Sequence, residues 1–196
     1  MTNIRQTGEV PRPRGFTLIE LLVTLVVLGI LLSLAVPSFG RLIAQNRMAT
    51  QTNEIVAGLN LARLEAVRRG QNIAIRANSG TLTFEAGWQI FTDSNGDGAR
   101  GDSTSVSDNT DGFLIRESGT LAGNTTVHRA TSAYADVGTS VTDRMYVVFN
   151  SRGANNSGAK AFFKVCDSGN TSVPGRIVQV SAVGKISLDS STATCP

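Results

Sequence analysis

The sequence has few of the residues that build metal centres and catalytic sites. Its 196 residues include one histidine, His128, and two cysteines, and no cysteine pair has metal-ligand spacing. A transition-metal site therefore has little support. The sequence has no internal repeat. No serine stands in the nucleophile-elbow motif of hydrolases. We therefore expect no enzymatic activity and no cofactor.

Charge is also scarce. Asp, Glu, Lys and Arg make up 17% of the chain, and the formal net charge is +3. Residues 1–15 hold three arginines and one glutamate, so the remainder carries 15 basic and 14 acidic side chains. A nearly neutral chain gives little support to a nucleic-acid partner held by its overall charge.

One long apolar run, from Phe16 to Val36, contains a single carboxylate, Glu20. A run of about 20 residues predicts a membrane helix, and arginines just before it predict a cytoplasmic N-terminus. A carboxylate in hydrocarbon is costly without a partner. Cleavage after Gly15 would give Phe16 a free α-amine one helical turn from Glu20, and these two groups can neutralise each other.

Two other interpretations stay open at this point. A secretory signal peptide has a positive head, an apolar core and a small-residue cleavage site, for which residues 33–35 are the candidate. A plain signal anchor would give Glu20 no role. The carboxylate inside the apolar core argues against both.

The segment Gly15-Phe16-Thr17-Leu18-Ile19-Glu20 before an apolar helix resembles the cleavage motif of type IV prepilins and type II secretion pseudopilins. The resemblance implies that a prepilin peptidase cuts after Gly15 and N-methylates Phe16. It also implies that Glu20 helps to register each subunit in a growing filament.

Helical periodicity continues beyond Pro37, which we expect to kink the helix rather than end it. Apolar and small residues recur at helical spacing, and Gly70 is the expected end of the helix. Glu65 and Arg69 have the spacing of a favourable pair on one helix face. The predicted buried stripe comprises Met48, Thr52, Ile55, Leu59, Ala62 and Ala66.

After Gly70 the period changes to two, which predicts short antiparallel strands. We expect them to form one sheet, which gives an α+β fold: a long N-terminal helix packed on an antiparallel β-sheet head. The polar tail, residues 189–196, is expected to be loose. The predicted strands are 73–77, 81–85, 88–92, 113–116, 125–128, 145–149, 161–166, 176–180 and 184–188.

The segment from Gly87 to Gly98, with its tryptophan strand and acidic turn, narrows the resemblance to the minor pilins and pseudopilins of the GspH/FimT group. The helix end, with Arg63, Glu65 and Gly70, matches the same group. The resemblance covers nearly the whole chain.

The two cysteines, Cys166 and Cys195, lie in the part expected to be exported. An even count there predicts a disulfide, which would tie the tail to the preceding sheet. Two free thiols are the alternative.

Asp93, Asn95 and Asp97 match the first half of a calcium-binding loop. The twelfth position is Thr104 rather than glutamate, and the flanks are predicted strands. A polar turn is therefore the competing interpretation.

Some minor pilins of this group bind DNA through a C-terminal Gly-Arg-x-Arg motif. Here the nearest match, residues 184–187, has Lys185 first and a serine in place of the second arginine. Arg176, Lys164 and Lys185 are the candidate phosphate contacts.

These inferences give four segments: residues 1–15 as a cleaved leader, 16–37 as a transmembrane and filament-core helix, 38–70 as the helix of the head, and 71–196 as a periplasmic β-rich domain. The expected function is a minor pilin or pseudopilin that primes or caps a type IV pilus or a type II secretion pseudopilus. The alternative is a DNA receptor for uptake. Expected partners are prepilin peptidase, other pilins or pseudopilins and the bacterial inner membrane.

Overall fold

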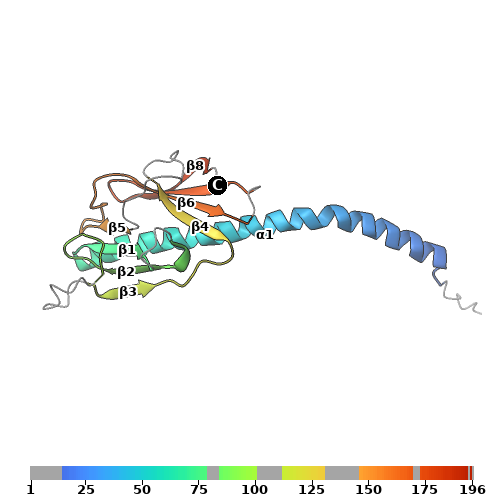
Figure 1. Cartoon of the computed structure of the whole chain (residues 1–196), viewed down its shortest axis with the longest axis horizontal. Coiled ribbons are helices and arrows are strands. Elements are labelled where there is room, and N and C mark those ends of the chain that lie inside the picture. The colour runs from blue at the N-terminus through green and yellow to red at the C-terminus, as the bar shows by residue number, and fades with distance from the viewer. Residues whose placement is uncertain are drawn as a thin grey trace, which may run out of the picture. The chain divides into compact units, whose positions relative to one another are not determined.

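The computed structural model describes residues 15–78, 84–100, 112–130, 146–169, 173–193 and 195, with the backbone alone at 34–38, 129–130 and 190–193. The predicted leader, apart from Gly15, lies outside this part of the chain. The chain divides into two compact units, Met1–Gly40 and Arg41–Pro196. One helix, α1 (Leu18–Arg69), contributes to both (Figure 1).

The first unit contains the apolar part of α1, whose described side chains are exposed. Its hydroxyl groups bond to the helix itself: Thr24 Oγ1 donates to the carbonyl of Leu21, and Ser33 Oγ donates to the carbonyl of Ile30. Such bonds satisfy polar side chains within a helix. Among the described residues, no helix combines the length and hydropathy of a membrane span. The span expected over residues 16–37 stays a prediction.

Residues 41–69 of α1 form the centre of the second unit. The predicted stripe is confirmed, because all six of its side chains are buried. The helix continues through residue 37 and ends at Arg69, where Gly70 adopts a φ of 66°. A left-handed residue directly after the last helical residue is the usual way to end a helix.

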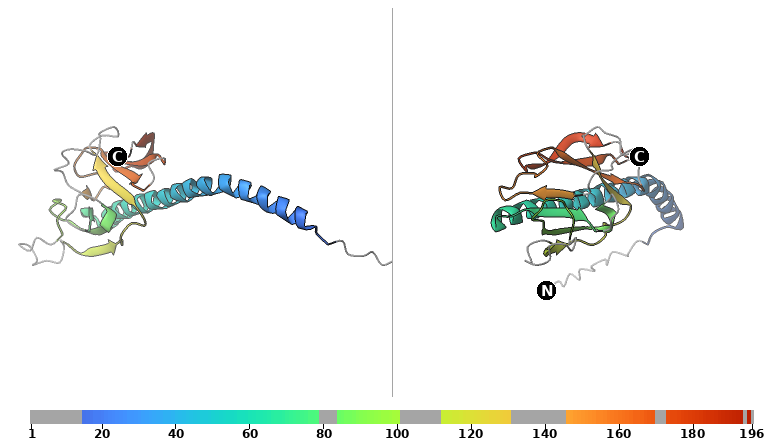
Figure 2. Two further views of the ribbon diagram at one scale, coloured as in Figure 1. Left: turned by 45° about the vertical axis from the view of Figure 1, so that its right-hand side comes forward. Right: turned by 60° about the vertical axis from the view of Figure 1, so that its left-hand side comes forward.

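Two four-stranded antiparallel sheets pack against this part of α1 (Figures 1 and 2). Sheet A has the order β3 (Leu114–Glu117), β2 (Trp88–Thr92), β1 (Ile73–Ala77) and β5 (Tyr146–Phe149). Sheet B has the order β4 (Thr125–Ala130), β6 (Ala161–Asp167), β7 (Gly175–Val180) and β8 (Ile186–Ala193).

A single apolar core joins the helix to both sheets. Ile75 and Val147 are register partners in sheet A, and Phe163 and Val178 are register partners in sheet B. All four side chains belong to this core. Phe84, in the 3₁₀ turn η1 (Phe84–Ala86), meets Phe163 edge to face at 5.4 Å between ring centroids. The turn therefore links the start of β2 to sheet B.

The α+β class and the helix packed on antiparallel strands are confirmed, but the expectation of one sheet is wrong. The break falls between β3 and β4, because β4 pairs with β6 rather than with β3. β5 returns instead to the open side of β1, with Ile73 opposite Phe149. Two sheets result because the helix buries apolar surface against both.

Two local expectations are also corrected. Phe84 and Glu85, predicted as strand, lie in η1, whereas residues 79–83 are outside the described residues. The tail predicted to be loose from residue 189 continues as β8 to Ala193, with Asp189 opposite Ile177 and Ala193 opposite Gly175. Backbone pairing with β7 orders this polar segment although it has little apolar surface to bury.

Candidate functional site

The helix start carries the residues expected to be processed and assembled. Gly15 and Phe16 are exposed and precede the first helical residue, Leu18. Thr17 caps the helix, since its Oγ1 accepts a hydrogen bond from the backbone N–H of Glu20 at 3.2 Å. This is the spacing of a capping box, in which a hydroxyl residue is followed three positions later by glutamate.

The cap has a consequence for Glu20. It fixes this carboxylate in the first turn of α1, where the partial positive charge of a helix N-terminus favours an anion. It also holds residue 16 outside the helix, one turn before the carboxylate. Sequence reasoning assigned Thr17 no role, although the Thr-x-x-Glu spacing is visible in the sequence. Cleavage, methylation and filament registration remain predictions.

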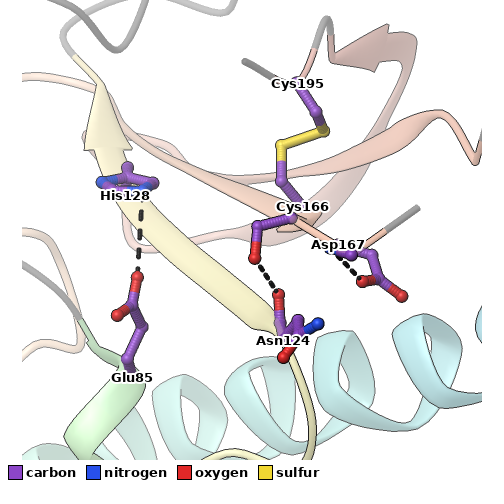
Figure 3. The surroundings of a disulfide bond; sticks show 8 residues. Glu85, Asn124, His128, Cys166, Asp167 and Cys195 are labelled. Carbon is purple, nitrogen blue, oxygen red and sulfur yellow. Dashed lines mark hydrogen bonds and ion pairs between the residues drawn. A yellow bond between two sulfur atoms is a disulfide. The ribbon is translucent and has the colours of Figure 1, made fainter. Parts of the chain in front are cut away.

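A disulfide joins Cys166, on β6, to Cys195 in the tail, with an S–S distance of 2.06 Å (Figure 3). Cys166 is buried and Cys195 is partly exposed. The bond closes a loop that contains both β7 and β8, and it holds the end of the chain on sheet B.

Next to the disulfide, Asp167 forms an ion pair with Arg47 of α1, with Nη2 and Oδ2 2.5 Å apart. Asp167 is 1% exposed, and its second oxygen accepts a hydrogen bond from the N–H of Gly169. Each carboxylate oxygen therefore has a donor, as a buried charge requires. The pair connects the helix to the end of β6, and no sequence pattern indicated it because the partners lie 120 residues apart.

A second carboxylate, Glu65, accepts hydrogen bonds from Arg69 and Arg68, each with a closest approach of 2.7 Å. The predicted pairing of Glu65 with Arg69 is thus present and is extended by Arg68. The hydrogen bond from Arg69, followed by that from Arg68, holds the pKa of Glu65 below its usual range. These contacts stabilise the last turn of the helix.

The acidic loop after β2 is organised as a turn around Asp93. This side chain is fully buried, and its two oxygens accept hydrogen bonds from the backbone N–H groups of Gly96, Asp97 and Gly98. The loop packs over the outer face of sheet A, where a Cβ on Gly98 would lie 2.2 Å from the ring of Tyr146. The spacing that suggested a calcium loop is therefore explained by a polar turn.

The other two residues of the calcium hypothesis also bond within the loop. Asn95 donates to Asp97 and accepts from the Asp97 N–H, while Asp97 accepts from the N–H of Ala99. Within the described ranges, no group of three or more His, Cys, Asp and Glu residues is placed to hold a metal ion.

The three candidate DNA contacts do not form one patch. Lys164 is 1% exposed, so its ammonium group is not available to a phosphate. Arg176 and Lys185 are exposed, but they lie at opposite ends of β7, because Lys185 directly precedes Ile186, the partner of Val180. Four residues of strand separate these ends by about 13 Å. Placing Lys164 in the patch was wrong, since β6 is covered on both faces.

His128, on β4, faces Glu85 of η1, with Nε2 and Oε1 4.0 Å apart (Figure 3). Burial lowers the pKa of His128, and the carboxylate of Glu85 opposes this shift in part. The histidine is therefore biased toward its neutral form, which suits a side chain packed between a turn and a sheet.

Comparisons with known proteins agree with these features. Residues 51–184 match the family described as type II transport protein GspH, and residues 11–36 match the prokaryotic N-terminal methylation motif. The first match covers more than half of the chain and includes the end of α1 and most of both sheets.

Individual relatives match a smaller part. A fimbrial protein of Pseudomonas aeruginosa is 32% identical over 102 residues, which are 52% of this chain and 64% of that protein. The pilin-like protein PilA1 of Thermus thermophilus is 36% identical over 84 residues, which are 42% of this chain and 49% of that protein. The matches therefore span 49% and 64% of the length of these two curated relatives.

A solved structure agrees in fold. The crystal structure of the type IV minor pilin FimU of Pseudomonas aeruginosa superposes with a TM-score of 0.56 at 20% identity, covering 76% of this chain and 95% of that one. With the family match and the methylation motif, this likeness agrees with the helix and strands described above. The chain belongs to the GspH family of type II transport proteins and carries the prokaryotic N-terminal methylation motif.

Proposed function

We propose that this chain is a minor pilin or pseudopilin, a structural subunit that helps to prime or cap a type IV pilus or a type II secretion pseudopilus. It acts by packing against other subunits rather than by catalysing a reaction. The observation that carries the proposal is the helix start, where Gly15, Phe16 and Glu20 stand in the methylation motif and Thr17 caps α1.

The proposal assigns a role to each segment. Residues 1–15 are the leader removed by a prepilin peptidase, and residues 16–37 anchor the subunit in the inner membrane and then in the filament core. Residues 38–70 and 71–196 form the periplasmic head. The N-terminus stays in the cytoplasm until cleavage, as expected for arginines that directly precede an apolar helix.

The mechanism depends on charge neutralisation in an apolar environment. Cleavage creates an α-amine at Phe16, and the helix cap keeps Glu20 one turn away. Within one subunit, or between neighbours, this amine compensates the carboxylate, which is otherwise costly in hydrocarbon. A subunit without Glu20 leaves a buried amine uncompensated, and breaking a buried charge pair is strongly unfavourable.

Filament incorporation tests this proposal. Glu20→Ala, Glu20→Asp and the wild-type chain are expressed in a host that assembles filaments, and sheared filaments and membranes are probed separately. We expect Glu20→Ala to be processed and found in membranes but reduced at least about tenfold in filaments, with Glu20→Asp intermediate. Wild-type incorporation of Glu20→Ala would contradict the pairing.

A further inference from the structure

Three aliphatic side chains are exposed where the end of α1 meets two turns of the head. Val183, in the turn between β7 and β8, is 70% exposed, and Leu64 and Val67 of α1 are exposed as well. We call these three residues the aliphatic patch. Scattered apolar side chains are ordinary on a protein surface, whereas a group of them at one place indicates an interaction site.

Two glycines bring the segments of this patch together. The carbonyl of Gly153, in the turn after β5, accepts a hydrogen bond from Arg63 Nε of α1 at 3.0 Å. A Cβ at residue 153 would lie 2.9 Å from Cγ2 of Val67, and a Cβ on Gly184 would collide with the carbonyl oxygen of Gly153. Because neither glycine has a side chain, α1, the turn after β5 and the turn after β7 lie in direct contact.

The turn that carries Val183 is held by its backbone. The N–H of Gly184 donates to the carbonyl of Ser181, and the carbonyl of Ala182 accepts from the N–H of Asn155. Gly184 has a φ of 77°, as in a hairpin in which a left-handed residue follows a tight turn. Turns of this kind favour polar residues and glycine, so the backbone gives no reason for an exposed valine here.

The charge around the patch has one sign. The segments that form it contain five basic residues and one acidic residue, Glu65. Glu65 is buried and accepts hydrogen bonds from Arg68 and Arg69. In the part of the chain that the structure describes, no salt bridge involves the other three cations, which we call the basic rim. The segments are residues 55–70, 150–157 and 181–187, and the basic rim consists of Arg63, Arg152 and Lys185.

The chemistry of this surface favours one kind of partner. Carboxylates would pair with the basic rim, in the geometry that arginine favours, and aliphatic side chains would remove the patch from water. A nucleic acid has phosphates for the rim but little apolar surface for the patch, and the three patch residues include no aromatic ring on which a base could stack. A protein segment with an aliphatic centre flanked by carboxylates meets both needs.

We propose that the aliphatic patch and the basic rim form a docking surface for such an acidic segment of a neighbouring pilin or pseudopilin subunit. That the partner is a subunit rests on the proposed function, whereas its chemistry does not. On that function the anchor precedes Arg41, where the second compact unit begins. Val67 lies about 39 Å further along α1, which places the surface beyond the reach of lipid head groups.

The valine methyl groups make a direct test possible. The mature full-length protein, with ¹³C-labelled valine methyl groups, is placed in nanodiscs of phosphatidylcholine and titrated with the blocked peptide Glu-Asp-Leu-Leu-Asp-Glu. Two matched peptides replace its acids by glutamine and asparagine, or its leucines by serine. We expect the first peptide to shift the Val67 and Val183 signals saturably, with a Kd at least about tenfold below those of the other two. A few exposed ion pairs, or one buried aliphatic side chain, are worth about that factor.

Variants assign the two parts of the surface. Arg152→Gln combined with Lys185→Gln should remove the preference for the acidic peptide over its uncharged counterpart. Val183→Ser should remove the preference for leucine over serine, with Val67 as the remaining reporter. Arg176→Gln, an exposed cation at the other end of β7, is the matched control and should change neither preference.

Several results would overturn the proposal. Equal shifts with the three peptides, or no shift with any of them, would show that the surface does not select this chemistry. Tighter binding of a duplex DNA oligonucleotide at the same methyl groups would assign the surface to nucleic acid. Shifts on replacing phosphatidylcholine by phosphatidylglycerol would assign it to the membrane. Because the titration needs no filament, its failure is distinct from a failure of the assembly role.

Discussion

Arg47 and Asp167 are joined by an ion pair that links α1 to the end of β6, and the neighbouring residue on β6, Cys166, forms the disulfide with the tail. Asp167 is 1% exposed, whereas the Arg47 side chain is 34% exposed. The carboxylate therefore depends on the arginine for its charge compensation more than the arginine depends on the carboxylate. Three segments distant in sequence meet at this point of the head.

Arg47→Met is expected to lower the free energy of unfolding by about 1–3 kcal/mol, because it leaves the Asp167 carboxylate buried without its partner. Adding Asp167→Asn should recover part of this loss by removing the charge. Urea unfolding of the full-length protein in detergent measures both effects. The control is Arg41→Met, at an exposed position of the same helix, which should change the free energy of unfolding by less than about 0.5 kcal/mol. If Arg41→Met lowered it as much as Arg47→Met does, the ion pair would be excluded as the cause.

The disulfide between Cys166 and Cys195 closes a loop with a sequence separation of 29. Loss of this cross-link is expected to cost about 3–4 kcal/mol on the chain-entropy account. The comparison is between oxidised and reduced wild-type protein, with the double variant Cys166→Ser, Cys195→Ser as the control that a reductant should not affect. Complete labelling of both thiols in denatured, unreduced wild-type protein would contradict the bond.

His128 should make the head less stable in mild acid. Burial lowers its pKa in the folded chain, so the unfolded chain, with a pKa of about 6.5, binds the proton more readily. Stability is therefore full above about pH 6.5 and falls as the pH drops from there toward the folded pKa. Unfolding of wild type and His128→Gln across this range checks the slope, which the variant should lack.

The variant Glu85→Gln tests the direction in which Glu85 changes the pH dependence of stability. The Glu85 carboxylate raises the pKa of His128 against the effect of burial, so removing its charge should steepen the loss of stability in acid. A shallower slope in Glu85→Gln would show that the pair does not act as described.

Asp93→Ala removes the acceptor of three backbone N–H groups and should lower stability by at least about 2 kcal/mol. Asp97→Asn, at an exposed position that retains an acceptor oxygen, should cost less than about 1 kcal/mol. Because the Asp93 oxygens already bond to the loop backbone, about 1 mM calcium should leave the thermal midpoint of the wild type unchanged. A calcium-dependent rise that Asp93→Asn abolishes would restore the metal-site interpretation.

Local pattern was enough to predict the helix and most strands. The stripe from Met48 to Ala66 follows the 3.6-residue period, and β1, β2 and β6 were predicted to within one residue at each end. Trp88 lies on the strand predicted over residues 88–92 and is 3% exposed. These features depend on residues close together in the sequence, and periodicity reports such features directly.

Pairing between distant segments was not predictable in the same way. The division into two sheets depends on the pairing of β5 with β1. The tail is ordered as β8 because its backbone pairs with β7. The burial of Lys164 follows from cover on both faces of β6. Arg47 with Asp167 and Gly58 with Trp88 are likewise contacts between α1 and distant strands. The periodicity of a sequence segment does not show which distant residue it will contact.

The most direct measurement is the intact mass and N-terminal sequence of the protein isolated from a host with an active prepilin peptidase and from one without it. The account predicts a mature chain that begins at Phe16 and carries one methyl group on its α-amine in the first host, and the unprocessed chain in the second. Gly15→Ala should slow or prevent cleavage, whereas Glu20→Ala should not. An unprocessed chain in the competent host, or a mature chain that begins after residue 35, would contradict the assignment of this chain as a pilin-type subunit.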